Sequence, residues 1–134
     1  MSWYEASAYA RWASGSLPTV AEWWRAAHGD TLQVFPWGVE GASAHRRANL
    51  EGVSTTPVGQ FPLGVSRFGV MDMAGNVREW LADSVPDSPR RLAAGGSWQD
   101  PLYMAMADAA HTERFDPAYS GDGLGFRIVR RRPK

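Results

Sequence analysis

Residues 69–80 read Gly-Val-Met-Asp-Met-Ala-Gly-Asn-Val-Arg-Glu-Trp, and this stretch decides how the chain folds. Asp72, Gly75 and Asn76 are residue types that favour turns, because Gly tolerates a positive φ and short polar side chains bond to nearby backbone groups. Bulky apolar side chains follow at once in residues 80–81. The stretch therefore predicts a compact turn that leads into the segment Glu79-Trp80-Leu81.

Downstream of this turn the sequence predicts two strands. The first covers residues 92–98 and contains the pair Gly95-Gly96, and the second covers residues 125–130 near the end of the chain. Between them, residues 98–122 show no clear period. Upstream, residues 30–67 carry a turn-forming residue every few positions, which predicts long loops with short strands.

Two helices are predicted at the start of the chain. Ser2 and Glu5 stand three residues apart, the spacing of a capping box, and an apolar stripe follows until Ser14-Gly15. Thr19 and Glu22 repeat the same spacing before a second apolar stripe, which Gly29 ends.

The composition excludes several classes of function. The 134 residues include no cysteine, so a disulfide framework, a thiolate zinc site and a cysteine nucleophile are all impossible. Fourteen basic and fourteen acidic residues give a net charge of zero, so we expect neither nucleic acid nor a membrane as partner. No apolar run approaches the roughly 20 residues that span a bilayer. The compartment stays open, with the cytoplasm favoured.

The order of these motifs resembles the formylglycine-generating enzyme/sulfatase-modifying factor family, a branch of the C-type-lectin-like fold. The matching pieces, in family order, are residues 2–6, 8–9, 17–19, 21–23, 36–38, 49, 56–59, 61–62, 71–80, 95–98 and 125–127. The resemblance implies an α+β domain over residues 1–134, loop-rich, with two helices on a small, mostly antiparallel sheet. Family domains usually carry a further stretch upstream, which is missing here. The chain is then either a fragment, whose fold a preceding segment or another chain would complete, or a shortened variant.

The resemblance also implies where the catalytic members hold copper. Their two copper-binding cysteines correspond to Asp100 and Ala105 in this chain, counted from Gly95-Gly96-Ser97. Neither residue can bind Cu(I) as a soft thiolate does. We therefore expect no copper and no catalytic residue.

A calcium site is implied by calcium-binding relatives. Its ligands would be the carboxylates of Asp72 and Glu79 and the main-chain oxygens of Gly75 and Val77, a donor set that suits a hard cation. The alternative is structural: Asp72 and Asn76 hold turn amides, and Glu79 pairs with an arginine.

The segment from Trp98 to Asp122 is the predicted binding face. Rigid aromatic and small polar residues are mixed in it, as in adaptable binding surfaces. The candidate contact residues are Trp98, Asp100, Tyr103, His111, Glu113, Phe115 and Tyr119. Trp98 and Phe115 are also candidates for the core, and Trp98 beside the double glycine is expected to be buried there.

We therefore expect a non-catalytic module that binds a protein or peptide. In relatives diversified by retroelements, the corresponding stretch is the hypervariable region that contacts the ligand. The resemblance is therefore consistent with a variable protein of that kind. The alternative is an oxidase of the formylglycine-generating class, or a related enzyme, with altered metal chemistry.

Overall fold

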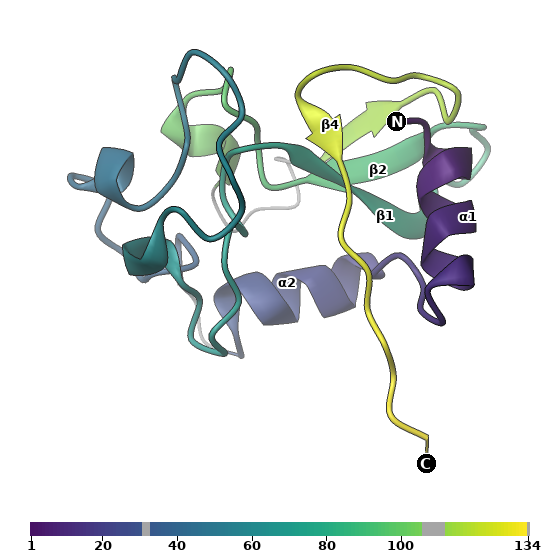
Figure 1. Ribbon diagram of the computed structural model, residues 1–134, viewed down its shortest axis with the longest axis horizontal. Coiled ribbons are helices and arrows are strands. Elements are labelled where there is room, and N and C mark those ends of the chain that lie inside the picture. The colour runs from purple at the N-terminus through teal and green to yellow at the C-terminus, as the bar shows by residue number, and fades with distance from the viewer. Residues whose placement is uncertain (31–32, 106–111, 134) are drawn as a thin grey trace.

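The computed structural model describes residues 1–30, 33–105 and 112–133 (Figure 1). Both predicted helices are confirmed: α1 spans Trp3–Trp12 and α2 spans Val20–His28. Each begins with a complete capping box, Ser2 with Glu5 and Thr19 with Glu22, in which the two partners satisfy each other's backbone amides. Among the described residues, no helix is long and apolar enough to cross a membrane.

A four-stranded sheet lies between the helices. Its strands are β1 (Arg78–Ser84), β2 (Arg91–Ala94), β3 (Glu113–Phe115) and β4 (Leu124–Gly125), in the order β3-β2-β1-β4. β1 and β2 pair antiparallel, as do β2 and β3, whereas β4 runs parallel to β1. The fold is thus α+β, with a mixed but mostly antiparallel sheet.

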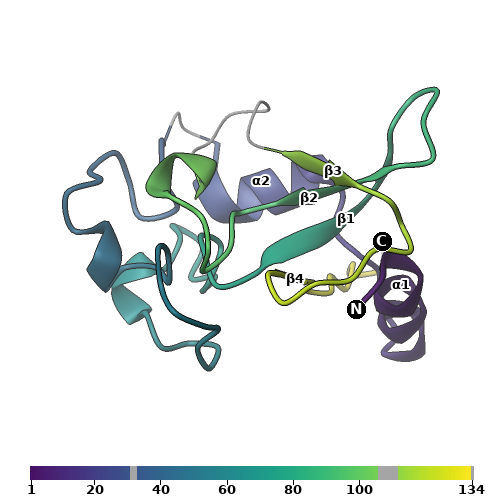
Figure 2. The same ribbon diagram turned by 90° about the horizontal axis from the view of Figure 1, so that it is seen from above.

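Strand β1 buries side chains on both of its faces. Trp80 joins the cluster under α1, together with Ala6 and Ala10, and is fully buried. Its neighbour Leu81 joins the cluster under α2, with Trp23. Because successive strand residues point to opposite faces, α1 and α2 cover opposite faces of the sheet, with β1 between them (Figure 2).

The downstream strands are shorter than the sequence predicts. β2 ends at Ala94, because Gly95 and Gly96 take φ values of 99° and 71° and turn the chain away. A Cβ on Gly95 would also lie 2.9 Å from the ring of Trp23. β4 ends at Gly125, and the chain beyond it runs extended, with one bridge between Val129 and Ser16 (Figure 1).

The loop predictions need a further correction. In the described part of residues 30–67, the regular elements are two 3₁₀ helices, η1 (Ala44–Arg46) and η2 (Pro62–Gly64), with isolated bridges in place of the expected short strands. The segment 98–122, predicted to be irregular, contributes a third 3₁₀ helix, η3 (Leu102–Ala105), and the edge strand β3.

The core assignment can be tested with two tryptophans. Trp80→Ala should cost roughly 3–5 kcal/mol of unfolding free energy, because a fully buried indole leaves a cavity in a core. Trp12→Ala is the control, because Trp12 is 79% exposed and its loss should change the stability by no more than about 0.5 kcal/mol. Chemical denaturation of both variants measures the difference. Equal losses would contradict the assignment of the core.

Candidate functional site

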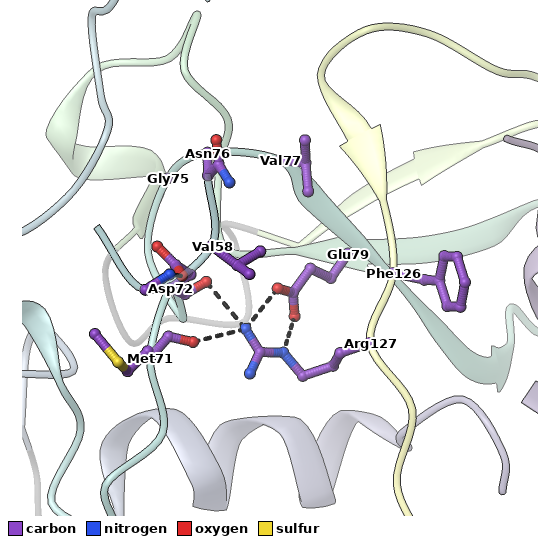
Figure 3. A pocket seen from close by; sticks show the side chains of 10 residues that line it. Val58, Met71, Asp72, Gly75, Asn76, Val77, Glu79, Phe126 and Arg127 are labelled. Atoms are coloured by element: carbon purple, nitrogen blue, oxygen red, sulfur yellow. Dashed lines mark hydrogen bonds and ion pairs between the residues drawn. The ribbon is translucent and has the colours of Figure 1, made fainter. Parts of the chain in front are cut away.

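The turn that precedes β1 forms one wall of a pocket of about 430 Å³. All four residues predicted to bind calcium line it, namely Asp72, Gly75, Val77 and Glu79. Phe126 and Arg127, from the segment after β4, also line the pocket, and the side chain of Arg127 points toward Glu79 and the turn (Figure 3). Residues far apart in the sequence therefore meet here.

The carboxylate of Glu79 forms an ion pair with Arg127. Its Nε donates to Oε2 at 2.6 Å and its Nη2 to Oε1 at 2.7 Å, a bidentate ion pair. Trp23 of α2 adds a third hydrogen bond, from Nε1 to Oε2 at 2.7 Å. Glu79 is only 5% exposed, so its charge is offset almost entirely by the protein.

The arginine also orders the turn itself. Nη2 of Arg127 donates to the carbonyl oxygens of Met71 and Asp72, at 2.9 and 3.1 Å (Figure 3). Burial acts to lower the pKa of Arg127, but the charge and hydrogen bonds of Glu79 outweigh it, and the pKa lies above its usual value. The guanidinium is therefore a permanent positive charge in this pocket.

The turn residues hold backbone groups, as the structural alternative predicts. Asp72 accepts from the amide of Gly59 at 2.7 Å, and Asn76 accepts from the amide of Thr56 at 2.9 Å. Asp72 and Asn76 have φ values of 57° and 67°, a conformation that short polar residues tolerate better than most. The structural alternative included a pairing of Glu79 with an arginine, but nothing in the sequence identified that arginine as Arg127.

A second ion cluster is centred on Arg78 of β1. Its guanidinium pairs with Asp100 at 2.7 Å and with Glu113 of β3. Asp100 also accepts from the amide and the hydroxyl of Ser97, at 2.7 and 2.9 Å. The cluster ties β1 and β3 to the turn after β2 and leaves one negative charge in excess.

Three of the predicted contact residues therefore face inward. Asp100 is 9% exposed and Glu113 is half-buried, both bound to Arg78. Phe115 packs edge-on against Trp80, with 5.9 Å between the ring centroids. These residues hold the scaffold together. For Asp100 and Glu113 this corrects the expected place on an exposed binding face, whereas for Phe115 it agrees with the core alternative.

Other predicted contact residues do reach the surface. Tyr103 in η3 is 56% exposed and Tyr119 is 48% exposed, the latter stacked on Phe115. His111 lies outside the described residues. Ala105, where the resemblance places a copper-binding cysteine of the oxidases, is buried.

Trp98 is partly buried and lies outside the core clusters, which corrects its expected place in the core. It lines a second pocket, of about 380 Å³, together with residues 53–55 and Asp122. Sequence reasoning did not connect residues 53–55 with this segment, because the contact is long-range: the amide of the adjacent Gly52 donates to the carbonyl of Trp98 at 2.7 Å.

The described residues hold no group of three or more His, Asp or Glu side chains placed to bind a metal ion. Around Asp72 and Glu79, further oxygen ligands would have to come from the backbone.

Comparison with known proteins places these features in a family. The sulfatase-modifying factor enzyme 1-like domain matches residues 1–132. The chain is 34% identical over 152 residues to the serine/threonine-protein kinase pkn1 of Chlamydia pneumoniae, covering 97% of this chain and 23% of the kinase. It is 35% identical over 153 residues to the inactive C-alpha-formylglycine-generating enzyme 2 of Bos taurus, covering 96% of this chain and 48% of that protein.

A protein named as an oxygenase is also among the relatives. The hercynine oxygenase of Mycobacterium tuberculosis is 41% identical over 136 residues, covering 97% of this chain and 28% of the oxygenase. The chain thus spans less than half the length of each of these relatives.

Solved structures show the same fold. PvdO from Pseudomonas aeruginosa superposes with a TM-score of 0.81 at 25% identity, covering 96% of this chain and 59% of PvdO. Variable protein 1 of Treponema denticola gives a TM-score of 0.71 at 27% identity, covering 84% of this chain and 46% of the variable protein. With its α+β, C-type-lectin-like architecture and a match over residues 1–132, the chain belongs to the sulfatase-modifying factor enzyme 1-like family.

Proposed function

We propose that this chain is a non-catalytic binding module that meets a protein or peptide through its 98–122 segment. The observation that carries the proposal is the state of the two positions that correspond to the copper-binding cysteines. Asp100 is held in an ion pair with Arg78, and Ala105 is a buried methyl group. Neither offers a ligand for a soft metal ion.

Exposed aromatic residues support the binding role. Tyr103 and Tyr119 present large rings to solvent, and Trp98 presents part of its indole. In Figure 1, η3 and the loop that precedes β4 lie on the side of the molecule away from α2 and the C-terminus. Exposed aromatic side chains on a rigid scaffold are typical anchors of protein interfaces.

Two kinds of relative favour this proposal. One is named as inactive, and another is a variable protein. A variable protein diversified by a retroelement would be consistent with both relatives. Recovery of the gene tests this origin, which a neighbouring reverse transcriptase with a template repeat matching the final segment of the chain would support.

The competing proposal is an enzyme with altered metal chemistry, which the oxygenase among the relatives favours. The neighbouring genes also bear on it, since a sulfatase beside this gene would favour the enzyme.

We further propose that calcium binds weakly in the pocket beside the turn. The pocket is lined by all four predicted ligands, Asp72, Gly75, Val77 and Glu79. The carboxylates of Asp72 and Glu79 together with the guanidinium of Arg127 give the pocket a net charge of minus one. The guanidinium that already neutralises Glu79 opposes a cation, so the affinity should be low.

The non-catalytic assignment predicts that the protein leaves a sulfatase-type cysteine peptide unchanged, with or without copper. The reason is that a copper-dependent oxidation of this class needs thiolate ligands, and the chain has no cysteine. Mass spectrometry of the peptide is the measurement. Loss of the thiol and gain of a carbonyl, dependent on this chain, would overturn the assignment.

The calcium proposal predicts that millimolar Ca²⁺ raises the melting temperature relative to a chelator, because a ligand of the folded state stabilises it by mass action. Asp72→Asn should remove the shift. Asp87→Asn removes the same charge from an exposed position between β1 and β2 and should leave the shift intact. Identical melting curves of the intact protein with calcium and with chelator would show that the proposal is wrong.

If the 98–122 segment is a binding face, a substitution of one of its exposed residues should lower the affinity for a ligand without lowering the stability of the fold. Peptides selected from a random library against this protein should bind Tyr103→Ala about tenfold or more weakly, because a few aromatic residues dominate most interfaces. Its unfolding free energy should change by no more than about 0.5 kcal/mol, since Tyr103 is 56% exposed.

Tyr4→Ala is the matched control, because Tyr4 on α1 is 57% exposed but lies outside the proposed face. Its melting curve and its peptide affinity should both stay close to those of the parent protein. A library that yields no binder, or binders that lose as much affinity with Tyr4→Ala as with Tyr103→Ala, would refute the binding face.

A further inference from the structure

The pocket beside Trp98 combines an aromatic wall, a carboxylate and hydroxyl groups. It measures about 380 Å³ and is lined by Val53, Ser54, Thr55, Trp98 and Asp122. This volume lies in the range of pockets that hold small ligands or single side chains. Three separate segments contribute to it, so its shape depends on the folded structure.

Trp98 is fixed by hydrogen bonds at three points. Its amide donates to the carbonyl of Asn76 at 2.9 Å, and its own carbonyl accepts from Gly52 at 2.7 Å. Its indole Nε1 donates to the carbonyl of Asp122 at 3.4 Å, which holds the two residues of the pocket together. These bonds hold Trp98 in place in the wall of the pocket.

The backbone at Asp122 is also held in place. A Cβ on the next residue, Gly123, would lie 3.1 Å from Nη1 of Arg78 and from Oγ of Ser97. The loop thus packs closely against the Arg78 cluster, and a side chain at position 123 would require these neighbours to shift by a few tenths of an ångström. Asp122 consequently keeps its position at the mouth of the pocket.

The charge around the pocket is negative. The Asp122 carboxylate is exposed, and within the described part of the chain it forms neither an ion pair nor a side-chain hydrogen bond. Arg78, the cation behind Gly123, is offset by both Asp100 and Glu113. Arg114 sits between Glu113 and Phe115 on β3 and is more exposed than either, as expected for a residue on the opposite face of the strand.

We infer that this pocket takes a cationic side chain, lysine or arginine, of the bound protein or peptide. The inference rests on the proposed binding function and adds the chemistry of the ligand. Tryptophan is the strongest of the aromatic residues in attracting a cation to its ring face. The free carboxylate of Asp122 adds a charge of the right sign, and the hydroxyl oxygens of Ser54 and Thr55 can accept hydrogen bonds from the same cation.

The test uses the indole N–H signal of Trp98, one of seven tryptophan signals in a ¹H–¹⁵N spectrum, identified by its loss in Trp98→Phe. The probes are acetyl-Gly-Lys-Gly-amide, its arginine analogue and its uncharged norleucine analogue. We expect the two cationic peptides to shift the signal saturably at millimolar concentration and the norleucine peptide to leave it unshifted. Added salt should weaken the binding, because the pocket is open to solvent.

Charge removal provides the matched comparison. Asp122→Asn should weaken the lysine peptide about two- to fivefold, the range for one exposed ion pair, whereas Asp87→Asn should not change its affinity. An equal response to the norleucine peptide would mean an apolar pocket and would overturn the inference. So would an unchanged affinity in Asp122→Asn.

Failure here is distinguishable from failure of the binding face. If selected peptides depend on Tyr103 but the cationic tripeptides do not shift Trp98, the cation pocket is wrong and the binding face stands. If the tripeptides bind as expected but the library yields no binder that depends on Tyr103, the binding face is wrong and the pocket stands as a cation site.

Discussion

The buried carboxylate of Glu79 is the interaction on which the rest of the structure depends. It accepts from Trp23 of α2 and from Arg127 of the C-terminal segment, while its own backbone belongs to the central strand β1. Removing one member of such a buried pair leaves an uncompensated charge, which typically costs 3–5 kcal/mol. The same arginine holds the turn before β1, so the helix, the sheet and the pocket share a single polar centre.

Local signals in the sequence predicted both helices, because each capping box lies within four residues. The strands were harder to predict, since β3 has three residues and forms only through pairing with β2. The inward position of Asp100 and Glu113 was beyond sequence reasoning for the same reason: their partner Arg78 lies 22 and 35 residues away. Trp98 was expected in the core because large aromatic side chains usually are buried, yet the turn at Gly95-Gly96 carries it to a pocket at the surface.

Scaffold and recognition are separate in this domain. The motifs that identify the family, residues 71–80 and 125–127, supply buried ion pairs and core packing. Asp100, where the resemblance places a copper-binding cysteine of the oxidases, joins a second ion cluster around Arg78. A fold of this kind can therefore change its surface, and with it its function, while its polar centre stays the same.

The pairing of Glu79 with Arg127 also has a consequence for biosynthesis. The ribosome adds Arg127 48 residues after Glu79, and β4, which pairs with β1, comes only just before that arginine. Until Arg127 has left the exit tunnel, the helices and the β1–β2 hairpin can form, but the carboxylate between them has no counter-charge. The domain is therefore expected to close as a unit late in its own translation, and a nascent chain that stops short of this arginine would expose an unfinished core to chaperones and proteases.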